Sequence, residues 1–481
     1  MHAAPVLKIL GLLLSVLAVA MLIPMSFDLL SGNTDWQAFA AASLFTGFIG
    51  ICLWLANRKI NDSDLGLKEA FLLTNGAWVL IGLFGALPFY FSSLQLSVVD
   101  SVFESTSGIT TTGSTILSHI EQASSGLLIW RALLQWLGGV GIIVMAMAVL
   151  PMLSVGGMQL FRTESFETAD KVIPRATQLA GGIFTVYTGL TILWTAMLAG
   201  AGMPSFDALA HAMTTLATGG YSTKTSSVGA FDSHLIELII IAGMIVGSLP
   251  FVHYLALVRG GWKGLWYDPQ VRWFVVLMAA VIALITLDLN RDGHSWAEAL
   301  RLSSFNAISV LTGTGYGTAD FALWGGSSTT ILLICMFIGG CAGSTTCGIK
   351  MFRLQVLAAN IKVQLARLLR PHAVVIAYYN NRAVPESVLD AVMGFFYLYI
   401  LCFVALTMIL GLFGLDFQTA LSGAATSISN VGPGLGDVIG PAGDFSNLPT
   451  GAKWAMCVGM LLGRLELFTV LVMLSPRFWG R

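Results

Sequence analysis

The stretch "VLTGTGYGT" (310–318) decides how the rest of this chain is interpreted. It places small and polar residues between segments of strongly apolar composition. Backbone amide and carbonyl groups are costly to bury in apolar surroundings without hydrogen-bond partners. A glycine-rich segment in such a place therefore needs protein or water to cover its backbone.

The composition is that of an integral membrane protein. The chain has 481 residues, of which 56% are hydrophobic and 10% are charged, and this excludes an ordinary soluble domain. A spanning helix needs about 20 apolar residues. We expect about ten spans, the eighth of them long and interrupted, at residues 5–27, 36–57, 69–93, 126–153, 180–203, 234–258, 271–289, 328–369, 390–414 and 452–475.

The charges predict an orientation. If both termini are cytoplasmic, most of the 24 lysines and arginines fall on the inner side, as the positive-inside rule requires. Many carboxylates then fall on the outer side, where an acidic mouth would attract cations, although acidic residues are also common in ordinary loops. The outer carboxylates include Asp28, Asp35, Asp100, Glu104, Asp207, Asp320 and Asp437.

The six cysteines lie in or beside apolar segments and include no C-x-x-C pair, so we interpret them as packing residues. They are Cys52, Cys335, Cys341, Cys347, Cys402 and Cys457.

One unit recurs four times along the chain. It consists of a long apolar helix, a short semi-polar stretch, a glycine-centred loop and another long helix. The loops are "TTTGST" (110–115), "ATGGYST" (217–223), "LTGTGYGT" (311–318) and "SNVGPGLG" (429–436). We divide the chain into two N-terminal transmembrane helices (1–65) and four units at residues 66–155, 156–260, 261–370 and 371–481. The second helix of the third unit is interrupted.

The short stretch in each unit predicts a re-entrant helix. At 1.5 Å per residue, about ten residues reach only about half of the hydrocarbon thickness, so the chain must turn back. Helix-start residues precede each stretch at Ser97 or Asp100, at Pro204 and Ser205, at Ser295 and at Asp416. Irregular backbone is tolerated at membrane depth where it lines a cavity. We therefore expect an all-α membrane protein with four pseudo-symmetric units around one pore.

The loops predict a site for a weakly hydrated monovalent cation. Aligned at their central glycines, they can direct carbonyl oxygens toward a common axis and replace the water shell of potassium. Hard divalent ions need carboxylates, which the loop centres lack. Each loop taken alone could be a plain turn, but four copies with one spacing favour a filter. The predicted filter residues are Thr111, Thr112, Gly113, Thr218, Gly219, Gly220, Gly313, Thr314, Gly315, Asn430, Val431 and Gly432.

These motifs resemble a known family. "GTGYG" (313–317) is similar to the T-V-G-Y-G filter of potassium channels, and four unequal copies after two extra helices resemble the Trk/Ktr/HKT superfamily of potassium transporters, specifically its bacterial TrkH subunits. Ser114 and Pro433 stand where channels have tyrosine. The resemblance implies potassium uptake with weaker discrimination against sodium, and free passage of rubidium.

The segment "GGCAGSTTCGIK" (339–350) interrupts the eighth span and is a gate candidate. Its glycines disfavour a continuous helix, and the resemblance implies a gate beneath the filter; a passive kink is the alternative. Arg464 lies within the final span, where facing lipid would cost at least ~2.5 kcal/mol. We interpret it as a positive constriction, with a structural salt bridge as the alternative. The predicted gate residues are Gly339, Gly340, Gly343, Ser344, Thr345, Thr346, Gly348, Lys350 and Arg464.

The chain itself shows no nucleotide-binding pattern, because "GTGYG" lacks the preceding strand of a dinucleotide fingerprint. The resemblance implies a cytosolic RCK/KTN-type (TrkA-like) regulator that carries the nucleotide, NAD or ATP/ADP, and a homodimer in the lipids of a bacterial inner membrane. We expect potassium as the transported ion, no covalently bound cofactor and no nucleic-acid partner.

Two other classes of membrane protein share some of these features. A sodium- or proton-coupled symporter also uses broken helices, but it usually shows inverted or two-fold repeats. An intramembrane aspartyl protease is suggested by "GLGD" (434–437), yet no second aspartate occurs within a span. Common hydrolase motifs are also missing, and we expect no enzymatic activity.

Overall fold

The computed structural model describes residues 3–59, 66–149, 157–158, 160, 176–261 and 263–480. Most of this part of the chain is helical, and its two strands, β1 (Tyr378–Tyr379) and β2 (Arg382–Ala383), form one short hairpin. It contains seven helices that are long and apolar enough to span a membrane, or nine if two bent helix pairs each count as one span. The predicted all-α membrane fold is confirmed.

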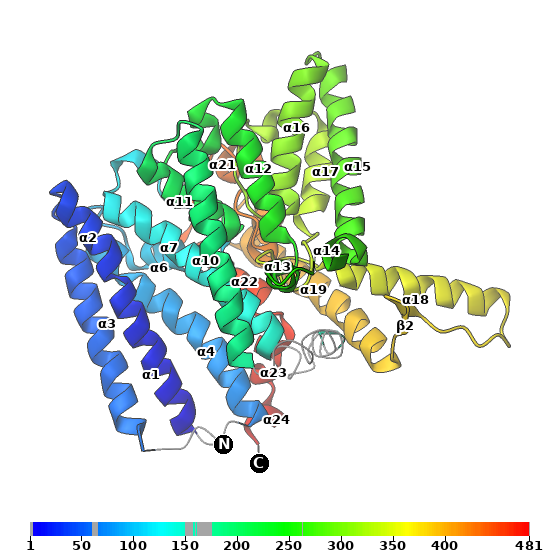
Figure 1. Cartoon of the computed structure of the whole chain (residues 1–481), viewed down its shortest axis with the longest axis horizontal. Helices are drawn as coiled ribbons and strands as arrows, with labels where there is room; N and C mark the ends of the chain where they lie inside the picture. Colours follow the sequence, from blue (N-terminus) through cyan, green and yellow to red (C-terminus); the bar gives the residue numbers. More distant parts are fainter. Residues whose placement is uncertain are drawn as a thin grey trace.

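The two N-terminal helices lie at one side of the bundle (Figure 1). The first, α1 (Ala3–Ala20), continues as α2 (Leu22–Ser31), and both pack against α3 (Trp36–Asn57). Asp28 in α2 is buried and accepts hydrogen bonds from the Gly126 amide (2.6 Å) and the Ser124 hydroxyl (3.1 Å). It thereby satisfies a free backbone amide at the start of α7 (Ser125–Val144), as a capping carboxylate does, and attaches the N-terminal helices to the first unit.

The four units follow in chain order. The main helices of the first unit are α4 (Leu67–Gly85), α6 (Val98–Ile109) and α7 (Ser125–Val144), and those of the second are α10 (Ala176–Gly200), α11 (Ser205–Leu216), α12 (His234–Ser248) and α13 (Phe251–Val258). The third unit has α15 (Pro269–Arg291), α16 (Trp296–Leu311), α17 (Gly326–Met336) and α18 (Met351–Leu369). The fourth unit has α19 (Glu386–Leu412), α20 (Phe417–Ser429), α22 (Thr450–Arg464) and α23 (Phe468–Leu474). Short helical segments are α5 (Leu87–Phe91), η2 (Ile120–Gln122), η3 (Met145–Val149), η4 (Ser227–Phe231), α14 (Lys263–Tyr267), η5 (Phe321–Leu323), α21 (Gly436–Ile439) and α24 (Pro476–Trp479).

The short helices α6, α11, α16 and α20 begin where the capping residues predicted. Ser97 and Ser295 accept hydrogen bonds from the amides three residues later, and Pro204 directly precedes α11. Asp416 accepts from the Thr419 amide at 3.1 Å, and hydrogen bonds from Thr419 hold the pKa of the Asp416 carboxyl below its ordinary value. Local capping chemistry therefore sets the start of each re-entrant helix.

Two of the expected spans are each broken into two helices. Residues 234–258 form α12 and α13, which are bent by 98° at Leu249 and Pro250; proline cannot donate a backbone hydrogen bond and clashes with the preceding turn. Residues 452–475 form α22 and α23, which are bent by 114°. Glu466 and Leu467 adopt positive φ angles at that break.

The eighth expected span is interrupted, as predicted. Its first half, α17, ends at Met336, and α18 begins at Met351. Figure 1 shows α18 running outward across the end of α15 rather than beside it. In the fourth span, α7 ends at Val144 and is followed by a π-helical turn. Three of the basic residues expected on the inner side, Arg162, Lys171 and Arg175, lie outside the described residues.

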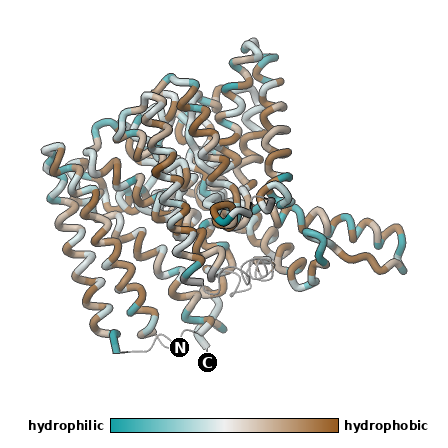
Figure 2. The backbone as a smooth tube through the Cα atoms, in the orientation of Figure 1, coloured by the Kyte–Doolittle hydropathy of each residue, from teal (hydrophilic) through white to brown (hydrophobic). Residues whose placement is uncertain are grey.

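The distribution of polarity suits a lipid surrounding. The outer helices are apolar along most of their length, and hydrophilic residues gather near helix ends and loops (Figure 2). Leu44, Ile192 and Val276 are each at least 66% exposed. In contrast, small polar side chains in the re-entrant helices, such as Ser107, Thr214 and Ser309, are fully buried. The centre of the bundle is therefore more polar than its perimeter.

Candidate functional site

The four glycine loops meet in a closed ring. We name them loop 1 (110–115), loop 2 (217–223), loop 3 (311–318) and loop 4 (429–436). A Cβ atom added to the central glycine of any loop would lie within 3.0 Å of a carbonyl oxygen in the next loop. The pairs are Gly113 with Gly219, Gly220 with Thr314, Gly315 with Val431, and Gly432 with Thr112. The order 1, 2, 3, 4 and back to 1 makes the loops quasi-equivalent walls around one axis.

The backbone of the loops also repeats. The central glycines have φ angles between 77° and 111°, and the residues two positions earlier are left-handed as well, with φ between 48° and 67°. These earlier residues are Thr111, Thr218, Gly313 and Asn430. Left-handed residues at every second position turn successive carbonyl groups toward the same side, and glycine adopts this conformation at the lowest cost. Such rows of carbonyls can coordinate a dehydrated monovalent cation.

Each loop is tied to the end of its own short helix by the same hydrogen bond. The amide directly before the central glycine donates to the carbonyl of a serine or threonine five residues earlier. The four bonds are Thr112 to Ser107 (2.9 Å), Gly219 to Thr214 (2.9 Å), Thr314 to Ser309 (2.9 Å) and Val431 to Thr426 (3.1 Å). The structure thus brings all twelve predicted filter residues together.

The residue after the central glycine connects neighbouring units. The Tyr316 hydroxyl lies 2.5 Å from the Thr214 hydroxyl of the second short helix. Tyr221 donates to the backbone carbonyl of Glu104 in the first short helix at 2.8 Å. In loop 1, the Ser114 hydroxyl donates to the Gly432 carbonyl of loop 4 at 2.7 Å. These contacts hold adjacent loops at a common level.

In each unit, the residue nine positions before the central glycine occupies an equivalent place, and the sequence analysis did not identify this position as part of the site. In three units this side chain bonds to the returning limb of its own loop. Glu104 accepts from the Ile116 amide (2.9 Å), His211 lies 3.0 Å from the Ser222 hydroxyl, and Asn306 accepts from the Thr318 amide (3.3 Å). The fourth position is Gly423, which has no side chain. The alignment of the repeats was the signal that could have located this position.

The placement of Glu104 at an acidic outer mouth was wrong. Glu104 is fully buried behind loop 1 and forms an ion pair with the buried Arg131 at 2.7 Å. Arg131 also donates to the Ser222 carbonyl at 2.9 Å and lies 4.0 Å from the centre of the Tyr221 ring. The pair therefore joins loops 1 and 2. Arg131 is a charged residue within an apolar span, which was the available signal.

Other residues of the expected acidic mouth are also engaged within the protein. Asp28, Asp35 and Asp207 are buried, and Asp207 accepts a hydrogen bond from Thr223 at 2.6 Å. Asp100 forms an ion pair with Lys453 at 2.5 Å. These carboxylates position loops and helices, so the mouth is less acidic than the sequence suggested.

The gate loop (339–350) lies directly against loop 2. The Thr345 amide donates to the Gly247 carbonyl at 3.1 Å, and the Thr218 hydroxyl donates to the Thr345 hydroxyl at 3.0 Å. The Cys341 amide donates to Ser248, next to the break between α12 and α13. The gate loop therefore fills the space created where that helix is interrupted.

The remaining gate-loop residues fold the loop upon itself. The Ser344 hydroxyl lies 2.8 Å from the Thr346 hydroxyl. The Thr346 hydroxyl also accepts a hydrogen bond from the Gly340 amide at 3.1 Å. Gly343 and Gly348 have positive φ angles, and a Cβ atom on Gly339 would collide with the Cys347 carbonyl. The loop is thus compact and buried rather than a simple kink in a helix.

Arg464 bridges three units. Its guanidinium donates to the Thr345 carbonyl at 3.1 Å, to the Cys347 sulfur at 2.6 Å and to the Gly138 carbonyl of α7 at 2.9 Å. Arg464 is 1% exposed. Its hydrogen-bond partners are thus two backbone oxygens and a thiol rather than a carboxylate.

Lys350 and Glu466 share a small cavity with Arg464. The Lys350 ammonium bonds to the backbone and hydroxyl of Thr346. Glu466, just beyond the end of α22, pairs with Arg353 at 2.5 Å. Two cationic groups, Lys350 at the end of the gate loop and Arg464, therefore line the same cavity.

The fold and this site define a class: a multi-pass membrane protein with four pseudo-symmetric re-entrant units around one axis. Residues 35–481 match the TrkH family model, described as cation transport protein. The chain therefore belongs to the TrkH family.

Relatives and a solved structure agree over the whole chain. The chain is 43% identical to the Trk system potassium uptake protein TrkI of Halomonas elongata, covering 99% of this chain and 97% of that protein. It is 37% identical to TrkH of Escherichia coli K12, covering both chains completely. The crystal structure of the potassium transporter TrkH from Vibrio parahaemolyticus superimposes with a TM-score of 0.92 at 35% identity, over 100% of each chain. The resemblance deduced from the sequence is confirmed.

Proposed function

We propose that this chain forms the membrane pore of a bacterial potassium uptake system. The observation that carries this function is the cyclic contact between the central glycine of each loop and a carbonyl oxygen of the next. Four walls of backbone carbonyls suit a large monovalent ion. The similar proteins named as potassium uptake proteins support potassium as the substrate.

The pore selects potassium and rubidium over sodium through loops 1 to 4. The twelve filter residues are those predicted from the repeats, and their bonds to the short helices keep the carbonyl spacing matched to the larger ions. Loop 4 carries Pro433 instead of tyrosine, and the preceding helix α20 has Gly423 where the other units have a side chain that holds the loop. Unequal walls should hold the ring less rigidly than identical ones, which makes discrimination against sodium moderate.

The gate loop and Arg464 close the pore beneath the ring. Contacts of Thr345 with loop 2 support this role, because they place the gate loop next to the filter. The buried charges of Arg464 and Lys350 repel a cation at that level. Opening then requires displacement of the gate loop and of Arg464 together.

A cytosolic RCK/KTN-type, TrkA-like subunit regulates the pore and binds NAD or ATP/ADP. The names of the similar proteins refer to a Trk system, which is consistent with further subunits. The pore subunit works as a homodimer in the bacterial inner membrane with both termini cytoplasmic. The two chain ends lie at the same end of the bundle (Figure 1), and Lys68 donates to the Gly480 carbonyl at 2.8 Å.

Flux measurements test this function. Purified protein is reconstituted into liposomes loaded with potassium, and uptake of radioactive rubidium is followed with equal pH and no sodium on either side. We expect rubidium uptake under these conditions. In separate samples with unlabelled potassium or sodium added outside, potassium should suppress rubidium uptake more strongly than sodium does. Uptake that requires a sodium or pH gradient would instead identify a coupled symporter.

A further inference from the structure

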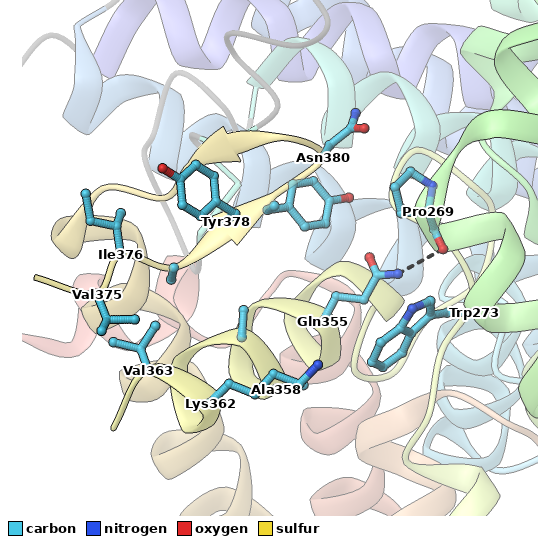
Figure 3. Close-up of a pocket in the computed structure, with 13 residues that line it drawn as sticks. Pro269, Trp273, Gln355, Ala358, Lys362, Val363, Val375, Ile376, Tyr378 and Asn380 are labelled. Carbon is cyan, nitrogen blue, oxygen red and sulfur yellow. Dashed lines mark hydrogen bonds between the residues drawn. The ribbon is translucent and has the colours of Figure 1, made fainter. Parts of the chain in front are cut away.

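A groove lies where α18, the first turns of α15 and the β1–β2 hairpin meet (Figure 3). Gln355 and Lys362 extend from α18, Trp273 from α15 and Tyr378 from the hairpin around this groove. Val363 and Ile376 contribute apolar walls. The groove is separate from the carbonyl ring and from the gate cavity, whose lining residues are different.

The groove lies level with the start of a helix long and apolar enough to span a membrane. Pro269, where the spanning helix α15 begins, is part of its wall. A helix end marks the level at which hydrocarbon gives way to head groups. Trp273 and Tyr378 are 48% and 61% exposed, and amphipathic aromatic side chains of this kind concentrate at that level.

The helix α18 has the character of an interfacial helix. It crosses the end of α15 (Figure 1), and Ile361, Leu365 and Leu368 form an exposed apolar stripe with exposures from 50% to 78%. An amphipathic helix that lies across the ends of spanning helices buries such a stripe among acyl chains. The groove beside it is therefore open to lipid.

The polar groups of the groove specify a head group. Lys362 is the charged residue among the lining residues that the structure describes, and none of them is acidic. Gln355 is 8% exposed; its amide nitrogen donates to the Pro269 carbonyl at 2.9 Å, while its amide oxygen has no partner among the described residues. A buried acceptor without a partner is costly. The groove thus offers one cation for a phosphate and one acceptor for a hydroxyl.

We propose that this groove binds an anionic phospholipid whose head group carries hydroxyl donors, of the phosphatidylglycerol class. Lys362 pairs with the phosphodiester, Gln355 accepts from a head-group hydroxyl, and the acyl chains lie along the apolar stripe of α18. A net negative lipid is favoured over a zwitterionic one because no carboxylate in the groove balances Lys362. Lipid binding here is independent of whether the pore conducts potassium.

Native mass spectrometry of the full-length protein tests this site. The protein is equilibrated in detergent with phosphatidylglycerol or phosphatidylethanolamine of identical acyl chains, and retained lipid is counted. We expect phosphatidylglycerol to be retained preferentially, and Lys362→Gln to lower its retention about fivefold, as expected for one interfacial charge. Gln355→Met should also lower it. Lys59→Gln, at the end of α3 and outside the groove, should leave it unchanged.

Three outcomes would overturn the assignment. Equal retention of both lipids, or retention unaffected by Lys362→Gln and Gln355→Met, would show that the groove does not recognise the head group. Displacement of phosphatidylglycerol by free glycerol phosphate would indicate a site for soluble phosphate. A loss of dimers in Lys362→Gln without loss of lipid would indicate that a second copy of the chain fills the groove.

Discussion

The hydroxyl of Thr218 in loop 2 lies 3.0 Å from the hydroxyl of Thr345 in the gate loop. The Thr345 hydroxyl also lies 2.9 Å from the Gly247 carbonyl and 3.1 Å from the Leu216 carbonyl at the end of α11. One side chain thereby connects the gate loop with both the filter loop and the short helix of the second unit. If residues 339–350 act as the proposed gate, their displacement would break these bonds, and we expect loop 2 to respond to it.

Removing the Thr345 hydroxyl should destabilise the closed gate. Each hydrogen bond contributes about 0.5–1.5 kcal/mol net, so we expect Thr345→Val to raise resting rubidium flux in proteoliposomes about five- to tenfold. Thr345→Ser retains the hydroxyl and should behave like the unmodified chain. The double variant Thr218→Val with Thr345→Val should show about the same flux as Thr345→Val alone, because each substitution removes the same hydrogen bond between the two hydroxyls. Fully additive effects would contradict the coupling.

Arg464 should stabilise the closed state through its hydrogen bonds to backbone carbonyls as well as through its positive charge. In Arg464→Ala the links to the Thr345 and Gly138 carbonyls are lost, and we expect rubidium flux to rise about tenfold, equivalent to about 1.4 kcal/mol. Arg464→Lys keeps the charge but cannot span both carbonyls, so intermediate flux is expected. Deleting residues 341–347 should open the pore similarly. Unchanged flux in all three variants would remove the gate assignment.

The central glycines should tolerate no side chain. A Cβ atom at Gly315 or Gly220 would collide with a carbonyl oxygen of the next loop, and both residues have positive φ angles. We expect Gly315→Ser and Gly220→Ala to reduce the selectivity for potassium over sodium at least about tenfold, read as competition against rubidium uptake. Gly189→Ala in α10 is the matched control, since nothing lies within 4 Å of its Cβ position. Unaltered selectivity in Gly315→Ser would show that loop 3 is not a wall of the filter.

The buried pair of Glu104 and Arg131 should matter for stability. Removing one partner leaves a buried charge, which costs about 3–5 kcal/mol, so Glu104→Gln should lower the unfolding temperature of the detergent-solubilised protein. The double change Glu104→Gln with Arg131→Met removes both charges and should recover part of that loss. Equal unfolding temperatures for the single and double variants would show that the two charges do not compensate each other.

Much of the fold and of the filter could be predicted from the sequence, because the evidence for both is local. Apolar length identifies the spans, capping residues mark the short helices, and a glycine loop at one repeated spacing aligns Gly113, Gly220, Gly315 and Gly432. The ends of the short helices and the register of the four loops depend on residues close together in the chain. The resemblance to a transport family rested on the same motifs.

The interrupted helices were only partly predictable. Glycine density located the break after α17, and Pro250 was an available but unused signal for the break after α12. The bend after α22 follows no comparable local pattern. It depends on Arg464 reaching Gly138, 326 positions away, and on Glu466 reaching Arg353, 113 positions away.

The sequence by itself determined the membrane class, the four repeats and the residues of the carbonyl ring, because composition and spacing act between near neighbours. The tertiary structure decided which loop follows which around the axis, the pairing of Glu104 with Arg131, the hydrogen bond between Thr218 and Thr345, and the outward course of α18. The contacts behind the first three of these features join residues that are 27 to 318 positions apart. Buried polar groups must find partners wherever the packing of distant helices places them, and that choice is made only when the whole bundle assembles.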